Sequence, residues 1–257
     1  MSNSFALLGG VGESTNIVAN RLRREFGDFP IILEERPSKW RLARRRARKL
    51  GLINILGQAL FVMGAEPWIA WRGRRRVQAI KQFCGLDTRP IRSNVVYLKS
   101  ANSDEAIERL RAANAALVVV NGTRILTRHT LQAAGMPFIN LHAGITPTFR
   151  GGHGAYWALA TGRPDLAGTT IHWIDTGIDT GTVIKQAVIE PGPEDCFVTY
   201  PYLQLSAGLP LLVSTIREFF LGEVRTVRIA GPDAGSSLCH HPTLWRYLSV
   251  KLRRGVG

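Results

Sequence analysis

The chain has 257 residues, of which 45% are hydrophobic and 20% are charged, and its formal net charge is +14 at pH 7. This composition is that of a folded globular protein with a full core and excludes a disordered chain. The excess of positive charge favours anionic partners, namely nucleic acid, an anionic membrane surface or phosphorylated substrates.

The three cysteines are Cys84, Cys196 and Cys239. They are widely spaced and odd in number, so we expect no disulfide framework and a reducing compartment. Cys239 is followed by two histidines, but the paired ligand motif of a zinc site is missing, so no metal is expected. The first residues lack the basic start and cleavage pattern of a signal peptide, and we therefore expect a cytoplasmic protein.

Short apolar runs alternate with helix-like segments along the chain. The runs lie at residues 5–8, 30–33, 95–98, 116–120, 138–142, 170–174 and 183–189. Helices are predicted at 14–26, 103–115 and 131–135, and a pair of helices broken at Pro210 at 200–220. This alternation predicts an α/β fold with a doubly wound, mostly parallel sheet. We divide the chain into an α/β domain, residues 1–190, and a helical C-terminal extension packed on it, residues 191–257.

A glycine-rich turn, Gly9–Gly12, follows the first predicted strand and opens the first helix. Backbone N–H groups at such a turn can bind a phosphate together with the helix N-terminus. The turn lacks the third spaced glycine of a dinucleotide fingerprint and the lysine of a P-loop. An anion site and a plain tight turn therefore stay open as alternatives.

Residues 36–76 form a basic and apolar helical insertion, with arginine and lysine clusters on both sides of an apolar middle. The apolar part is marginal in length, because a membrane span needs about 20 apolar residues. Asn54, Gln58 and Glu66 interrupt it, and basic clusters on both sides conflict with the charge asymmetry of a single span. Two interpretations remain, a buried helix with solvated arginines and a helix lying at an anionic membrane interface. Nucleic-acid binding is disfavoured, because aromatic residues are not interleaved with the arginines as a stacking surface would need.

Polar residues occur at the end of the strand predicted at residues 138–142. Side chains two apart in a strand share a face, so Asn140 and His142 project together. The carboxyl end of a strand in an open α/β sheet is where ligands bind, and a later loop carries Asp175 and Asp179 between glycines. An amide, an imidazole and a carboxylate suit carbonyl polarisation, proton transfer and orientation of the base. An edge-strand polar pair and an ordinary turn explain the same residues without catalysis.

Several motifs occur in order between residues 116 and 190. They are Val120–Leu126, Asn140-x-His142, Phe149–Gly152, Gly168–His172 and Asp179–Gly181. Together they resemble the 10-formyltetrahydrofolate-dependent formyltransferase family, in particular its branch that acts on nucleotide-linked amino sugars. The resemblance implies a Rossmann-like formyltransferase fold, with the insertion at 36–76 as an addition.

The resemblance also implies roles for the matching residues. Asn140, His142 and Asp179 match the catalytic triad. An unprotonated amine would attack the formyl carbon of 10-formyltetrahydrofolate, Asn140 would donate to the developing oxyanion, His142 would donate a hydrogen bond or move a proton, and Asp179 would orient His142. The residues implied to hold the folate are Asn121, Gly122, Thr123, Arg124, Ile125, Leu126 and Asp175. Those implied to contact the substrate are Gly10, Gly12, Arg150, Gly151 and Gly152.

One departure from the family pattern lies next to the histidine. Many members have Pro-Ser there, whereas this chain has Ala143 and Gly144. Substrate contacts made by that turn are therefore not transferred to this chain.

Three amines compete as the formyl acceptor. Methionyl-tRNA suits the positive charge, but that branch has a C-terminal β-domain where residues 190–257 predict helices. Glycinamide ribonucleotide suits the glycine-rich turn but not the insertion. We therefore expect a nucleotide-linked amino sugar used in surface polysaccharide synthesis, with residues 36–76 binding a pyrophosphate or holding the enzyme at the inner face of the membrane.

Two alternatives are not enzymes. One is a catalytically silent sugar- or folate-binding module, and the other is a basic RNA- or membrane-binding protein. The intact triad argues against the first, and the second rests on charge alone. For the enzyme we expect no nucleic-acid partner, and a homo-oligomer is left open.

Overall fold

The computed structural model describes residues 4–36, 51–227 and 235–257. Within these residues a seven-stranded sheet has the order β3-β2-β1-β4-β5-β7-β8. Its strands are β1 (Phe5–Gly10), β2 (Ile31–Glu34), β3 (Val95–Leu98), β4 (Leu117–Asn121), β5 (Phe138–His142), β7 (Gly168–Trp173) and β8 (Val183–Val188). The first five in chain order are parallel, and β7 is antiparallel to both of its neighbours. The predicted α/β fold with a mostly parallel sheet is confirmed.

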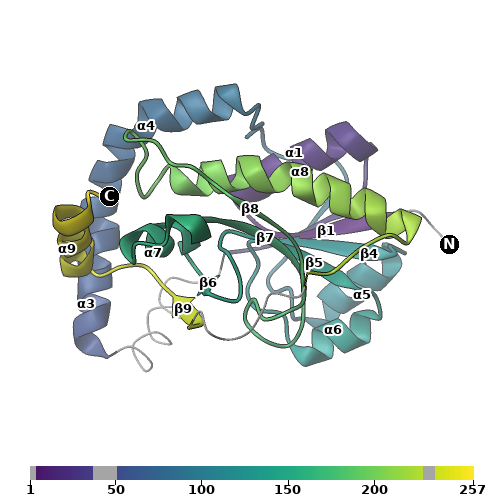
Figure 1. Cartoon of the computed structure of the whole chain (residues 1–257). Coiled ribbons are helices and arrows are strands. Elements are labelled where there is room, and N and C mark those ends of the chain that lie inside the picture. Colours follow the sequence, from purple (N-terminus) through teal and green to yellow (C-terminus); the bar gives the residue numbers. More distant parts are fainter. Residues whose placement is uncertain (1–3, 37–50, 228–234) are drawn as a thin grey trace.

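Helices cover both faces of the sheet (Figure 1). On one face lie α1 (Glu13–Phe26) and α8 (Tyr200–Leu221), which share a buried cluster with the sheet. On the other lie α5 (Asp104–Ala112) and α6 (Arg128–Ala134), which share a second cluster. The molecule therefore has the three layers of a doubly wound fold.

The period-2 alternation of the strands assigns each side chain to one of these layers. On β5, Ile139 and Leu141 belong to the cluster beneath α1 and α8, whereas Phe138 belongs to the cluster beneath α5 and α6. Asn140 and His142 share the face of Phe138, because successive side chains alternate. The predicted same-face pair thus points away from α1 and α8, at the carboxyl end of the strand.

The predicted break in the late helix is wrong, because α8 runs through Pro210 without interruption for 22 residues. A proline removes one N–H and crowds the preceding turn. Pro210 is exposed, however, while Leu205, Leu209 and Leu212 are buried against the sheet. The burial of this apolar face outweighs the loss of one hydrogen bond on the solvent side.

A third cluster holds the insertion and the C-terminal extension together. From Leu52 onward, the predicted insertion at residues 36–76 lies in a continuous helix that extends beyond residue 76 and is formed by α3 (Leu52–Leu60), the wider turn η1 (Phe61–Ala65) and α4 (Glu66–Phe83). It packs with α7 (Gly154–Ala160) and α9 (Leu244–Arg254) around buried aromatic rings, among them Phe61, Tyr156, Phe197, Tyr200 and Tyr247. The basic positions between Lys39 and Lys49 lie outside the described residues.

Smaller elements complete the fold. A 3-10 turn, η2, spans Pro164–Leu166, and β6 (Phe149–Gly151) pairs in parallel with β9 (Ser237–Cys239). The helical C-terminal extension is confirmed in α8 and α9, and β9 is an addition, since three residues are too few to show a strand period. The boundary at residue 190 stays a prediction.

Candidate active site

A cavity of about 470 Å³ lies at the carboxyl ends of β4 and β5. Its walls are the loop after β4, the end of β5, the loop between β7 and β8, and β9. The predicted site residues that line it are Asn121, Gly122, Thr123, Arg124, Ile125, Leu126, Asn140, His142, Gly151, Gly152, Asp175 and Asp179. The strand order changes direction between β1 and β4, which is where ligands of open α/β sheets bind.

Three predicted substrate contacts are not among the lining residues of this cavity. Gly10 packs against the carbonyl oxygen of Gly122, where a Cβ would collide. Gly12 caps α1. The Arg150 guanidinium donates to the carbonyl of Ile178 at 3.3 Å. The structure therefore gives Gly10 and Arg150 contacts within the fold, and their predicted substrate contacts stay untested.

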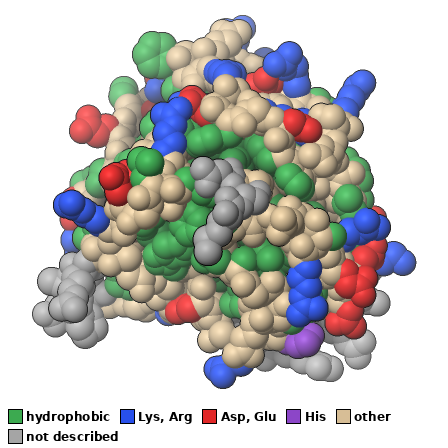
Figure 2. Space-filling view, turned by 90° about the vertical axis from the view of Figure 1, so that its right-hand side faces the viewer, with side chains coloured by type: hydrophobic (Ala, Val, Ile, Leu, Met, Phe, Trp, Pro, Cys, Tyr) green, Lys and Arg blue, Asp and Glu red, His purple; other side chains and the backbone are tan. Residues whose placement is uncertain are grey.

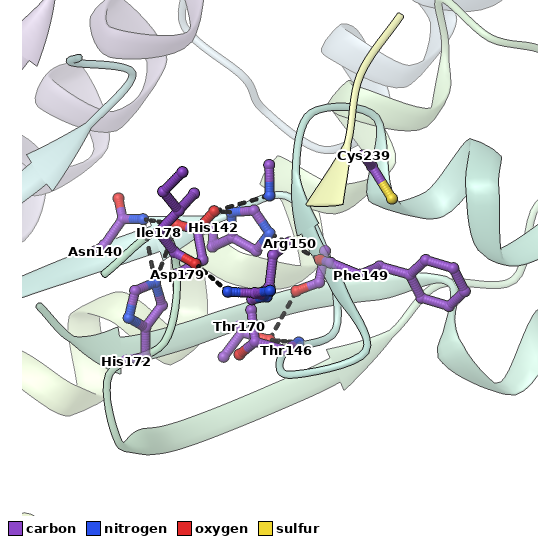
Figure 3. Close-up of polar contacts among 12 residues, drawn as sticks. Asn140, His142, Thr146, Phe149, Arg150, Thr170, His172, Ile178, Asp179 and Cys239 are labelled. Carbon is purple, nitrogen blue, oxygen red and sulfur yellow. Dashed lines mark hydrogen bonds and ion pairs between the residues drawn. The ribbon is translucent and has the colours of Figure 1, made fainter. Parts of the chain in front are cut away.

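Asp179 joins the strand pair from its loop (Figure 3). Its carboxylate lies 3.4 Å from the Asn140 amide nitrogen and 3.4 Å from His142 Nδ1. The backbone N–H of Gly151 donates to it at 2.9 Å. Asp179 has a φ of 50°, a left-handed conformation that aspartate tolerates better than most residues. The amide, imidazole and carboxylate thus meet at one wall of the cavity.

A second histidine, to which the sequence motifs assign no role, completes this group. The antiparallel pairing of β5 and β7 places His172 opposite Asn140. His172 Nδ1 lies 2.8 Å from the carbonyl oxygen of Trp173, which can only accept, so Nδ1–H donates to it. Nε2 is then an acceptor, 3.2 Å from the Asn140 amide nitrogen. A lone histidine in an apolar strand was the available signal, but its partner depends on the strand register.

The protonation states follow from burial and neighbours. Burial lowers the pKa of His142, against the opposing effects of Asp179 and the Phe149 carbonyl, and keeps the ring neutral. Burial also disfavours the ionised form of Asp179, but the neighbouring side chains of His172 and His142 and the Gly151 N–H outweigh it, so the pKa of Asp179 is lowered. Asp179 is ionised beside a neutral His142.

Both ring nitrogens of His142 face acceptors. Nδ1 faces Asp179, and Nε2 lies 3.1 Å from the carbonyl oxygen of Phe149. A neutral imidazole has one N–H and can donate to only one of them, whereas a protonated ring donates to both. A proton taken up by His142 would therefore give each ring N–H an acceptor, although burial lowers the pKa of the ring.

Two glycines allow this packing. A Cβ on Gly144 would lie 2.6 Å from His142 Nε2 and 2.5 Å from the Phe149 carbonyl oxygen. Gly151 has a φ of 85°, and a Cβ there would lie 2.5 Å from the carbonyl oxygen of Cys239 on β9. The Ala-Gly sequence after the histidine, which departs from the family pattern, thus has a steric reason in this chain.

The buried carboxylate of Glu34 holds the loop after β4 in place. Glu34 is 3% exposed, accepts the Arg124 N–H at 2.9 Å and pairs with the Arg124 guanidinium at 2.5 Å. The Asn121 side chain accepts a hydrogen bond from Ser14 at 2.9 Å and so ties β4 to α1. The polar side chains of Asn121 and Arg124 are engaged within the fold, while Ile125 remains 49% exposed.

The opposite wall is shaped by Asp175 and β9. Asp175 is exposed and accepts hydrogen bonds from the Gly177 N–H at 2.9 Å and the Thr180 hydroxyl at 2.6 Å, which fold the loop between β7 and β8. Cys239 and His240 line the cavity from the C-terminal extension. Burial raises the pKa of the Cys239 thiol to about 11, so this sulfur stays protonated at neutral pH.

A family model described as formyl transferase matches residues 53–201, more than half of the chain. The chain belongs to the formyl transferase family. The matched part contains Asn140, His142, His172 and Asp179. The family resemblance of the sequence motifs is thereby confirmed.

Curated relatives of this formyl transferase family member match over part of their length. Methionyl-tRNA formyltransferase of Synechococcus sp. (strain JA-2-3B'a(2-13)) is 32% identical over 139 residues, which are 54% of this chain and 41% of that protein. The same enzyme of Koribacter versatilis (strain Ellin345) is 32% identical over 130 residues, again 41% of its length. The chain thus spans about two fifths of the length of the curated relatives it matches.

Solved structures with the same fold include enzymes with different acceptors. A sugar N-formyltransferase from Shewanella sp. FDAARGOS_354 has a TM-score of 0.56 at 13% identity, covering 92% of this chain and 76% of that one. Phosphoribosylglycinamide formyltransferase from Anaplasma phagocytophilum has a TM-score of 0.57 at 19% identity, covering 91% and 96%. At these identities the likeness shows the fold alone.

Proposed function

We propose that this protein transfers the formyl group of 10-formyltetrahydrofolate to the primary amine of a nucleotide-linked amino sugar. The observation that carries the proposal is the meeting of Asn140, His142 and Asp179 at the wall of one cavity. Family membership supports formyl transfer as the reaction. The alternative of a silent binding module is disfavoured, because each of the three groups is placed for a chemical task.

The cavity suits a folate. One wall is the peptide backbone of Gly122–Leu126, with Ile125 exposed beside it, and Ile174 and Asp175 lie on another wall. A pterin ring has polar edges that pair with peptide groups and flat faces that pack on apolar side chains. We assign Gly122–Leu126 and Asp175 to the folate, which supplies the formyl group when it is bound.

Asn140 is the proposed donor to the formyl oxygen. One of its two amide hydrogens points to His172 Nε2, which accepts it at 3.2 Å. The other faces Asp179 over 3.4 Å, a long contact that a substrate oxygen can replace. One such donor contributes about 3 kcal/mol to the stability of an oxyanion transition state.

His142 is the proposed acceptor for the proton that the amine loses, and the proton reaches Nδ1 through the Asp179 carboxylate, which lines the cavity and faces that nitrogen. Its neutral ring has a free pair of electrons, and the Phe149 carbonyl and Asp179 accept hydrogen bonds from the protonated form. Asp179 holds the ring in place and stabilises its positive charge, as an ionised carboxylate does beside a histidine base. The Gly151 N–H in turn fixes Asp179.

We assign the acceptor to a second cavity of about 440 Å³, which shares Ser14 with the first. Arg74 on its wall suits a phosphate group, and Glu66 and Gln78 suit sugar hydroxyls. Burial raises the pKa of Glu66 above its usual range. This mixture of one cation with neutral and acidic groups supports a nucleotide-linked sugar, for which we propose a cytoplasmic role in surface polysaccharide synthesis.

Methionyl-tRNA is the second candidate. The curated relatives carry that name, and the net charge of +14 suits a polyanion. Binding of tRNA through backbone charge would weaken steeply with added salt, whereas binding of a nucleotide sugar in a cavity would weaken much less.

An acceptor panel tests the function. The purified chain is incubated with 10-formyltetrahydrofolate and, separately, dTDP-, GDP- and UDP-linked amino sugars, glycinamide ribonucleotide and methionyl-tRNA, and formylated product is measured by mass spectrometry. We expect product with a nucleotide sugar, and about 100-fold less or lower still with the Asn140→Ala variant. Product with methionyl-tRNA or the ribonucleotide alone would overturn the acceptor, and no product with any amine would overturn the reaction.

A further inference from the structure

The insertion and α9 lie together at one end of the molecule (Figure 1). Both expose large apolar side chains. We call this group the apolar end face; its members are Leu52, Ile53, Leu56, Leu60, Met63, Trp68, Trp71, Trp245, Leu248 and Leu252. Leu52 is 81% exposed, Met63 is 74% exposed and Leu252 is 86% exposed. Water-exposed apolar surface of this extent marks a docking surface.

The spacing of these residues turns them away from the body of the molecule. Leu52, Leu56 and Leu60 are four residues apart and therefore lie on one side of α3. Gly57 and Phe61 lie on the other side and are buried. The apolar side chains on the outer side of this helix are exposed and do not pack in the core.

The neighbouring helix α9 repeats the pattern. Trp245, Leu248 and Leu252 follow one another at spacings of three and four residues and are exposed, while Tyr247 and Val250 are buried. Both helices thus carry one apolar side inward and one outward, although a surface helix ordinarily turns polar residues to water.

Contacts between the helices show that they lie side by side. The ring of Trp245 covers Gly57, and the Lys251 ammonium lies 5.6 Å from the ring centre of Trp68. The residue numbers of these two pairs increase in the same direction on both helices, so the helices run parallel. The exposed sides of α3 and α9 therefore belong to one end of the molecule.

The charged groups at this end are almost all positive. Residues 51–83 contain one acidic residue and five basic ones, of which Arg76 pairs with Asp195 and Lys81 with Glu13, and residues 244–257 contain four basic residues and no acidic one. Arg72, Arg75 and Arg253 are exposed there. By contrast, acidic and basic side chains both occur on the face shown in Figure 2, which belongs to the opposite side of the molecule. The apolar end face thus complements a surface that is both apolar and anionic.

Tryptophans and arginines are paired on α4 at this end of the molecule. The Arg72 guanidinium lies 4.9 Å from the ring centre of Trp68, and that of Arg74 lies 4.7 Å from the ring centre of Trp71. Exposed tryptophans beside basic residues are typical of helices that rest in the headgroup region of a bilayer.

We propose that the apolar end face docks the protein onto an anionic lipid bilayer, with α3 and α9 resting in the headgroup region. A second copy of the chain is a poorer occupant, because two such faces would bring like charges together. By length and composition the helix Leu52–Phe83 is also a candidate span. The inner side of this helix, however, packs in the cluster shared with α7 and α9. Only its outer side is therefore free to contact lipid, and the helix lies along the bilayer surface without crossing it. The proposal does not depend on the proposed function.

Co-sedimentation with vesicles tests the docking. The full chain is mixed with vesicles of phosphatidylglycerol and phosphatidylcholine, or of phosphatidylcholine alone, and the bound fraction is measured. We expect binding to the mixed vesicles and little to the neutral ones. Absence of binding to the mixed vesicles would overturn the proposal.

Two triple variants separate the apolar and the electrostatic contributions. Leu52→Gln with Leu56→Gln and Met63→Gln should weaken binding roughly tenfold or more, because the inserted surface is lost. Arg72→Gln with Arg75→Gln and Arg253→Gln should weaken it on the order of 100-fold, since each basic residue near an anionic leaflet contributes roughly fivefold.

Matched controls remove the same chemistry from other surfaces. They are Tyr97→Gln with Val188→Gln and Leu221→Gln, and Arg92→Gln with Arg109→Gln and Arg128→Gln, all at exposed positions. We expect the apolar control to bind as the wild type does and the basic control to lose less than the basic variant. Equal losses in variants and controls would overturn the proposal.

Folding and self-association are checked in parallel. Circular dichroism verifies each variant, and the single substitution Met63→Gln, at an exposed position, replaces a triple variant that fails to fold. Analytical ultracentrifugation measures the oligomeric state. A wild-type dimer that the apolar substitutions dissociate, with no vesicle binding, would assign the face to a second copy and overturn the proposal.

Discussion

The active-site cavity draws polar side chains away from water, whereas the apolar end face exposes apolar side chains to it. At the cavity, polar groups such as Asn140, His142 and Asp179 are withdrawn from water and paired with one another. At the end face, leucine and tryptophan side chains are exposed to solvent beside arginines. Burial shifts the pKa values of the groups at the cavity. At the end face, the favourable free energy of removing apolar surface from water is gained only when a partner binds. Substitutions in the two regions should therefore have separable effects.

The largest expected effect is the loss of catalysis at the cavity. Asn140→Ala, His142→Ala and Asp179→Ala should each lower kcat about 10²- to 10⁴-fold, because an oxyanion donor or a proton-transfer group is lost. Steady-state kinetics with the best amine of the panel measures this. The melting temperature should stay close to that of the wild type, and near-normal turnover in any of the three would remove that residue from the proposed mechanism.

At the other region the largest effect should be on stability. Phe61 is fully buried and its ring centre lies 5.0 Å from those of Phe197 and Tyr247. Phe61→Ala should lower the free energy of unfolding by about 3–5 kcal/mol, as cavities in aromatic cores do. Urea denaturation measures the change, and Phe83→Ala, at a side chain that is 94% exposed, is the control expected to change little.

Gly144 offers a test of the packing around the imidazole. Gly144→Ser introduces a Cβ into the space of His142 and the Phe149 carbonyl, and overpacking of this kind costs about 1–3 kcal/mol. We expect lower stability together with a lower kcat. Gly64→Ser is the control, since nothing lies within 4 Å of a Cβ there. Wild-type kinetics in the Gly144 variant would show that the ring does not need this space.

His172 should act as a positioning residue with a smaller effect. His172→Ala removes the acceptor that holds the Asn140 amide, and we expect roughly a tenfold fall in kcat with KM unchanged, the pattern of an interaction that matters in the transition state. A rise in KM without a fall in kcat would instead place His172 in ground-state binding of the substrate.

The free energy of unfolding should depend on pH through the titration of His142 and Asp179 at the cavity. The pKa of buried His142 is lowered, so the unfolded chain takes up a proton near pH 6.5 while the folded chain does not. The free energy of unfolding should therefore fall as the pH drops below about 6.5. The lowered pKa of Asp179 adds a further decrease below about pH 4, where the unfolded carboxylate becomes protonated. Urea denaturation from pH 8 downward tests this, and His142→Gln should flatten the first decrease; an unchanged slope would contradict the assignment.

Several features of the fold and site follow from local chemistry. Alternation along residues 138–142 predicted that Asn140 and His142 share a face, because the strand period is two whatever surrounds the strand. The order of the motifs between residues 116 and 190 predicted the family, and the apolar runs predicted the strands to within a few residues. The break at Pro210 failed because local propensity does not include the burial of Leu205, Leu209 and Leu212 on the sheet.

The remaining features depended on contacts between distant segments. The pairing of His172 with Asn140 follows from the antiparallel register of β5 and β7. The need for glycine at position 151 follows from the approach of β9, more than eighty residues later in the chain.

By itself the sequence determined the sheet type, the polar pair and the family, since these depend on periods and motifs carried by consecutive residues. The tertiary structure decided which groups meet the pair, the neutral state of His142, and which side of the insertion faces water. Packing sets the distances and the desolvation that fix a pKa, and packing alone divides an apolar helix into a buried side and an exposed one.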